Sequence, residues 1–288
     1  MNAPASLTAI VDPVISLVPR LELRESLRRA FSEEQAAVSD IERLFQLLPS
    51  SVWSKDLLST FAGSWKATHL KMLAIYGLSC RLQRTADAAE EADRSNFHLA
   101  AARNAATSYE DLGLDFDAHT HAELFDDFAE ALVGDDGWQL RRYRLPEARQ
   151  FTSWVYRGMV VAPIQDGLLT NMFSEIYNHG EYSLALPAAD AYFRCHTQLT
   201  GEERRKASLY IAAHVEGGTE ADHFLIVGEA LERYLAASGT RLDTERATSL
   251  FRTYLRNLAP VMRSLTALMR IESSGRAAAS VAVGAGQE

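Results

Sequence analysis

Apolar residues recur at intervals of three and four positions through most of this 288-residue chain, and this spacing restricts its fold more than any other feature. No segment shows the sustained alternation of apolar and polar residues that marks a half-buried strand, and no Asn-Gly or Asp-Gly turn joins two β-branched runs. The sequence therefore predicts an all-α protein, a bundle of seven or more helices.

Prolines, glycines and capping residues place the helix ends. Helices are expected over residues 21–48, 54–85, 88–109, 121–132, 146–177, 200–237 and 244–271. Pro163 should kink or divide the fifth of these. Gly134 and Gly239 are suited to the left-handed C-cap conformation, and Thr200 with Glu203 forms a capping box. Residues 1–50 are predicted to be an N-terminal helical extension, 51–272 the main helical domain and 273–288 a disordered tail.

Charge and cysteine content exclude several classes of protein. The chain has 29 Lys and Arg against 38 Asp and Glu, a net charge of −9 without a basic patch, so no nucleic-acid or membrane partner is expected. Cys80 and Cys195 are too few for a disulfide framework and form no CxxC pair. No apolar run approaches the length of a membrane span, and the first residues lack the pattern of a signal peptide. A cytoplasmic location is expected.

Three groups of carboxylates and imidazoles are candidates for chemistry, because a helical bundle builds its sites from side chains of several helices. The first is His214, Glu220 and His223 within an otherwise apolar helix. At about 100° per residue, Glu220 and His223 project about 60° apart and could chelate one metal ion. A solvated acidic face is the alternative for this pair.

The second and third groups lie earlier in the chain. Glu110 ends one predicted helix and His121 begins the next, so a turn through Gly113 could return both to one point. Glu175 follows a strongly apolar run, Leu168 to Phe173, and is expected to be buried. A buried carboxylate needs a cation, a proton or strong hydrogen-bond donors.

Together these groups supply three carboxylates and three imidazoles: Glu110, His121, Glu175, His214, Glu220 and His223. Carboxylates can bridge two divalent ions and imidazoles can complete their coordination, whereas thiolates are missing from the set. The set is typical of a site for two iron ions, with manganese as an alternative, that binds dioxygen. Glu110 and Glu175 are also the candidate catalytic residues.

With these residues the sequence resembles the haem-oxygenase-like diiron oxidases and oxygenases, which share their fold with TenA-type thiaminases and the PQQ-synthesis oxidase. The similarity covers about residues 55–240. It is carried by Glu110 with His121-Ala-Glu-Leu-Phe, by Glu175 before Glu181-Tyr-Ser, and by the late His214–His223 segment. The resemblance implies that Glu110, His121 and part of the late helix hold one iron, and that Glu175 helps to hold the other.

The late helix departs from the family pattern. His214 and His223 are nine residues apart, which places them about 180° apart on a regular helix. Consecutive glycines, Gly217 and Gly218, lie between them and favour a π-bulge that would bring the histidines together. In a regular helix, Glu216 would replace His214 as a ligand. Asp222 is the alternative to Glu220.

Three functions follow as hypotheses. The resemblance implies a non-haem diiron oxygenase that uses O2 and an electron donor to oxidise a small amino-acid-like or fatty-acid-like metabolite in secondary metabolism, by N-oxygenation, desaturation or C–C cleavage. The second hypothesis is a cofactor-free TenA-type or PQQ-synthesis-type enzyme in which buried Glu175 or Glu110 acts as an acid or base. The third is a non-catalytic binding or oligomerisation module, and a homodimer is possible under any of the three.

Overall fold

The computed structural model describes residues 6–109 and 119–284 of the chain, with side chains up to residue 276. Every regular element in these ranges is helical, and none is a strand. The helices are α1 (Leu7–Ile15), α2 (Leu21–Glu33), α3 (Gln35–Leu47), α4 (Lys55–Thr68), α5 (Met72–Ala88), α6 (Glu91–Ala106), α7 (His121–Val133), α8 (Pro146–Val160), α9 (Ile164–His196), α10 (Gly201–Ala207), α11 (Leu209–Val215), α12 (Thr219–Ser238) and α13 (Thr244–Gly284). The predicted all-α fold is confirmed.

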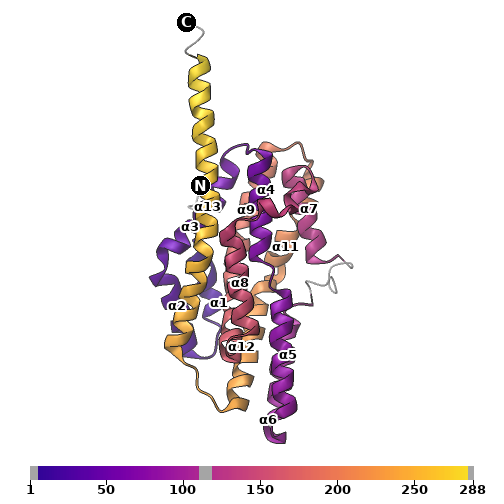
Figure 1. Cartoon of the computed structure of the whole chain (residues 1–288), viewed down its shortest axis with the longest axis vertical. Helices are drawn as coiled ribbons and strands as arrows, with labels where there is room; N and C mark the ends of the chain where they lie inside the picture. The colour runs from indigo at the N-terminus through magenta and orange to yellow at the C-terminus, as the bar shows by residue number, and fades with distance from the viewer. Residues whose placement is uncertain (1–5, 110–118, 285–288) are drawn as a thin grey trace.

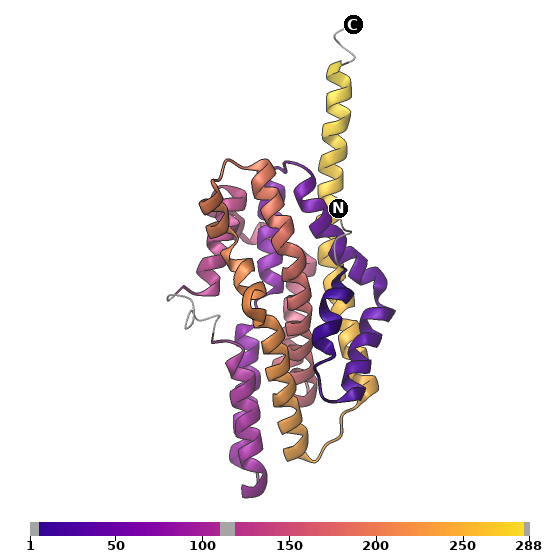
Figure 2. The same cartoon turned by 180° about the vertical axis from the view of Figure 1, so that it is seen from behind.

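Helix α9 is the central element of the bundle. It has 33 residues, and from Asp166 to Phe193 most of its side chains are buried on all sides. A helix buried all round must be covered by neighbours on every face. Helices α8, α11, α12 and α13 pack against it, as does α1 from the N-terminal region. Figures 1 and 2 show these helices running roughly parallel to one another along the long axis of the molecule.

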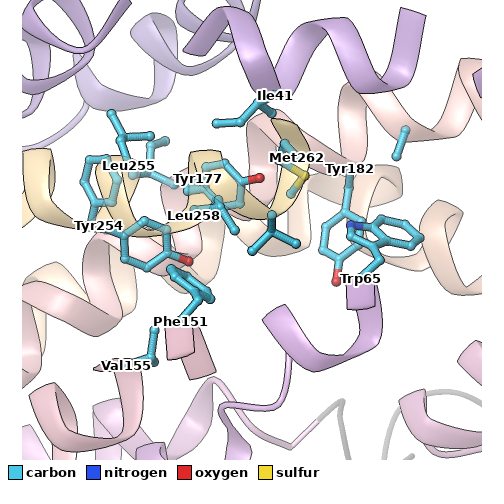
Figure 3. Close-up of a cluster of buried hydrophobic side chains, with 14 of the residues drawn as sticks. Ile41, Trp65, Phe151, Val155, Tyr177, Tyr182, Tyr254, Leu255, Leu258 and Met262 are labelled. Carbon is cyan, nitrogen blue, oxygen red and sulfur yellow. The ribbon is translucent and has the colours of Figure 1, made fainter. Parts of the chain in front are cut away.

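Aromatic side chains fill the space between α9 and its neighbours. Tyr177 of α9 lies against Tyr254 of α13, with ring centroids 5.5 Å apart, and Phe151 of α8 meets the same tyrosine at 5.0 Å. Figure 3 shows this cluster and, farther along, Trp65 beside Tyr182. Such close ring contacts add to the free energy gained by burial, and they fix the position of α9 relative to α4, α8 and α13.

The N-terminal helices share this core. Leu7 and Ile41 belong to the same buried cluster as the residues of α9, and α2 and α3 lie along α13. Ion pairs join the α2–α3 region to α13. Glu34 lies 2.8 Å from Arg252, and Asp40 lies 2.7 Å from Arg263. Residues 6–50 therefore pack as part of the bundle, and the boundary at residue 50 stays a prediction.

Most of the predicted helix ends are confirmed. Gly134 and Gly239 have left-handed C-cap conformations, and Thr200 and Glu203 form both hydrogen bonds of a capping box. Pro163 divides the fifth predicted helix into α8 and α9. Pro146 occupies the first turn of α8, where its missing N–H costs no helical hydrogen bond.

Three expected continuous helices are broken, and two are longer than expected: α9 runs to His196, past the predicted end at residue 177, and α13 runs past residue 271. The predicted 21–48 helix is interrupted at Glu34, the 54–85 helix at residues 69–71, and the 200–237 helix near residues 208 and 216–218. Helix α13 continues to Gly284 in place of the disordered tail expected from residue 273, in keeping with the high helix propensity of its Ala-rich end. In Figure 1 this end of α13 projects beyond the other helices.

None of the described helices is long and apolar enough to cross a membrane.

Candidate metal centre

Two helices, α9 and α12, bring a carboxylate pair and an imidazole to one buried point. Glu175 comes from the middle of α9, and Glu220 and His223 come from the first two turns of α12. One ligand atom from each of the three lies within 4.8 Å of the other two, and all three residues are buried. Oxygen and imidazole donors at this spacing suit a divalent cation such as Fe(II) or Mn(II).

The segment before α12 brings His214 to the same point. Helix α11 ends at Val215, Gly217 and Gly218 take positive φ values of 75° and 80°, and α12 starts at Thr219. The predicted π-bulge is therefore wrong. The helix ends and a new one starts, because two successive left-handed residues cannot continue a right-handed helix. The break places Nδ1 of His214 2.6 Å from Oε1 of Glu220.

The alternative ligands point away from this cluster. Glu216 lies in the break itself and is exposed, and Asp222 is exposed on α12. The regular helix in which Glu216 would replace His214 is not formed. Within residues 214–223 the buried residues are His214, Glu220 and His223, the three members of the predicted ligand set that lie in this segment.

His121 extends the cluster from the side of α7. It is the first residue of that helix, buried, and positioned by the capping box between Thr120 and Glu123. Its ring centroid lies 4.5 Å from that of His214. Tyr182 of α9 stacks on His214 with centroids 4.1 Å apart and rings nearly parallel. The His214 imidazole thus contacts both of these rings, and its Nδ1 lies beside Glu220.

Five of the six predicted ligands therefore lie in one connected group: His121, His214, Glu220, Glu175 and His223. The sixth, Glu110, lies outside the described residues, so the structure does not place it. The prediction that these residues bind metal stays a prediction. What the structure adds is that residues spread over about a hundred positions of sequence meet inside the bundle.

Burial dominates the electrostatics of Glu175. Removal of the carboxyl from water raises its pKa to about 8, an effect that the nearby Lys71 ammonium opposes and the Glu220 carboxylate reinforces. Lys71 Nζ lies 2.9 Å from Oε1 of Glu175, and Nδ1 of His223 lies 3.9 Å from its Oε2. At neutral pH Glu175 thus holds a proton that a bound cation would displace.

Lys71 is the functional candidate that the sequence analysis missed. It lies in the break between α4 and α5, inside what the apolar spacing predicts as one helix. The same break carries His69. In the structure, Nε2 of His69 lies 3.0 Å from Oε2 of Glu181, and Trp65 donates to Oε1 of the same carboxylate at 3.0 Å. A polar His-Leu-Lys sequence within an apolar helix was the available signal.

One observation that does not depend on the family resemblance indicates that these side chains suit a cation. Oε2 of Glu220 is buried and has no hydrogen-bond partner among the described residues. A buried acceptor without a donor costs free energy, and a metal ion is one way to satisfy it. The Glu220 carboxylate also raises the pKa of Glu175, and a shared divalent ion would relieve that repulsion.

No family model matches this sequence, and no curated protein does. Among solved structures, a TenA homolog from Pseudomonas syringae pv. tomato matches with a TM-score of 0.61 and 10% sequence identity, over 88% of this chain and 95% of that one. The fold is TenA-like. This confirms the TenA-like fold that the sequence resemblance implied. At this identity the likeness concerns fold alone, and the diiron subgroup stays a prediction.

Proposed function

We propose that this chain is a non-haem iron enzyme that uses O2 to oxidise a small molecule. The observation that carries the proposal is the buried meeting of Glu175, Glu220 and His223, joined by His214 and His121. Glu220, between the two imidazoles His214 and His223, is the residue best placed to serve two ions. Glu110 completes the proposed set from the part of the chain that the structure does not describe.

The protein residues have separable tasks in this proposal. A pair of iron ions, when bound, would supply the electrons and the binding site that O2 activation requires. Glu175 holds a proton at neutral pH, since its pKa is raised to about 8, and would have to release this proton to serve as a ligand. Tyr182 holds the His214 ring in orientation, and the buried surroundings of the cluster exclude water from it.

Iron uptake is the direct test. The metal-free protein is loaded with Fe(II) under argon, freed of excess metal and analysed for iron, and optical spectra are then followed on exposure to O2. We expect about two iron ions per chain and a transient absorption band. A protein that retains no iron and shows no transient contradicts the proposal, and a parallel loading with Mn(II) decides between the two metals.

Two single substitutions on the same turn of α12 distinguish a metal ligand from a neighbouring carboxylate that does not bind metal. Glu220→Gln removes the negative charge at the centre of the cluster, so we expect at least one iron ion to be lost. Asp222→Asn is the matched control, because Asp222 lies two residues away on the same helix and is exposed. Equal iron contents in the two variants would show that Glu220 does not bind metal.

A cofactor-free enzyme is the second candidate, and one observation favours it. Glu175 has a pKa near neutrality and a resident cation, Lys71, which are the properties of a general acid or base that needs no metal. Turnover that persists in excess chelator would select this function. The non-catalytic module, by contrast, predicts dispersed and exposed Glu175 and His223, and both are buried together.

A further inference from the structure

A pocket of about 350 Å³ opens beside the candidate metal centre, between the α4–α5 break and helices α7, α8 and α11. The lining residues His121 and Tyr210 are buried, and both rings contact His214. Six further lining residues are apolar or aromatic: Leu70, Met72, Leu73, Ala122, Phe125 and Tyr156. Its size and lining are those of a small-molecule site.

The polar lining residues are already engaged with the protein. Lys66 forms an ion pair with Asp126 at 2.5 Å and lies over the rings of Phe125 and Trp138. Nδ1 of His69 lies 2.8 Å from the carbonyl oxygen of Trp65, and its Nε2 lies 3.0 Å from Glu181. A ligand with a formal charge would have to break one of these contacts, and an unpaired charge is costly in an apolar site.

The mouth of the pocket is apolar as well. Leu70, Leu73 and Tyr156 are exposed there, and Leu73 has 74% of its surface open to solvent. Grouped exposed apolar side chains next to a cavity are typical of a binding site, because a ligand would cover them. A volume of about 350 Å³ holds on the order of twelve water-sized groups, which corresponds to an unbranched chain of about ten carbons.

We propose that this pocket binds a neutral, predominantly apolar molecule of about this size, with one end against His121 and Tyr210. Of the two metabolite classes expected from the sequence, this favours a hydrocarbon-like body over an amino acid with its two charges. The orientation toward His121 matters for oxidation only if the proposed function holds. Binding itself does not depend on a metal.

Three ten-carbon probes that differ in charge test the proposal: decan-1-ol, decanoate and decylamine. Each is titrated into metal-free protein in chelator at neutral pH, below its aggregation limit, and binding is measured by calorimetry. We expect decan-1-ol to bind with a Kd at least ten-fold lower than either charged probe. Equal or tighter binding of decanoate would assign the pocket to acids through Lys66, and no binding of decan-1-ol would also overturn the proposal.

Two tryptophan substitutions locate the binding. Ala122 is exposed at the pocket wall, so Ala122→Trp should fill the cavity and raise the Kd for decan-1-ol at least ten-fold. Ala36→Trp, at an exposed position of α3 outside the pocket lining, is the matched control. If Ala122→Trp lowers the unfolding midpoint, Leu73→Asp at the solvent-exposed mouth replaces it. Unchanged decan-1-ol binding in the pocket variant contradicts the proposal, whereas failed iron uptake would contradict only the proposed function.

Discussion

The ammonium of Lys71 lies 2.9 Å from the carboxyl of Glu175 in the buried centre of the bundle. The same ammonium donates to Ser174 Oγ at 3.1 Å and to the side-chain oxygen of Asn178 at 2.8 Å, in the amide orientation that satisfies both Asn178 groups. One short break between α4 and α5 thus docks on one turn of α9. Lys71 provides positive charge beside the carboxylates before any metal enters.

Replacement of this lysine should destabilise the metal-free protein. Removal of one partner of a buried ion pair typically costs about 3 kcal/mol, so at pH 9, above the pKa of Glu175, Lys71→Met should lower the free energy of unfolding by about that amount. Urea unfolding in chelator measures it. Lys206→Met, which removes an exposed and longer contact to Asp127, should change the value by less than about 0.5 kcal/mol. Equal effects of the two substitutions would show that the buried contact contributes no more to the free energy of unfolding than the exposed one.

The stability of the metal-free protein should fall as pH rises from about 4.5 to 8. Over this range Glu175 has its ordinary pKa of 4.5 in the unfolded chain and loses its proton there, whereas the folded protein keeps it up to about pH 8. The folded state then binds more protons than the unfolded state, so the free energy of unfolding decreases with pH. Glu175→Gln cannot ionise and should remove this part of the slope.

Paired unfolding curves at several pH values, for the wild-type protein and Glu175→Gln, give this contribution as a difference. The difference should be smallest near pH 4.5 and grow toward pH 8 in favour of the variant. A constant difference across the range would mean that Glu175 does not titrate abnormally in the folded protein.

The two glycines of the α11–α12 break should be required for their backbone conformation. An alanine at Gly217 or Gly218 meets no atom within 4 Å, so its cost comes from the positive φ alone, about 1 kcal/mol or more at each position. Because the break positions His214 against Glu220, we also expect each variant to bind less iron.

Gly275→Ala is the control for these variants. Gly275 lies within helix α13, is exposed and has nothing within 4 Å of an added Cβ. Alanine there should raise the free energy of unfolding by about 0.5–1 kcal/mol, since glycine is the poorer helix former. If Gly217→Ala were equally stabilising, the left-handed conformation in the break would be contradicted.

The sequence by itself determined the local structure of this protein. Apolar spacing, Pro146, Pro163 and the cap residues Gly134 and Gly239 act within a few positions of themselves, so they specify helices and their ends without reference to the rest of the chain. The same spacing indicated that Glu175 is buried, because it follows a long apolar run.

Only the tertiary structure decided that His69 and Lys71 join the buried polar cluster. The break at His69 to Lys71 contains neither proline nor glycine, and it forms because His69 and Lys71 find Glu181 and Glu175 on a helix more than a hundred residues away. The pocket beside His121 likewise depends on how five helical segments pack, and no local pattern encodes it. Contacts between distant segments are set by packing of the whole core, and the energy that holds a buried charge comes from partners that the neighbouring sequence does not contain.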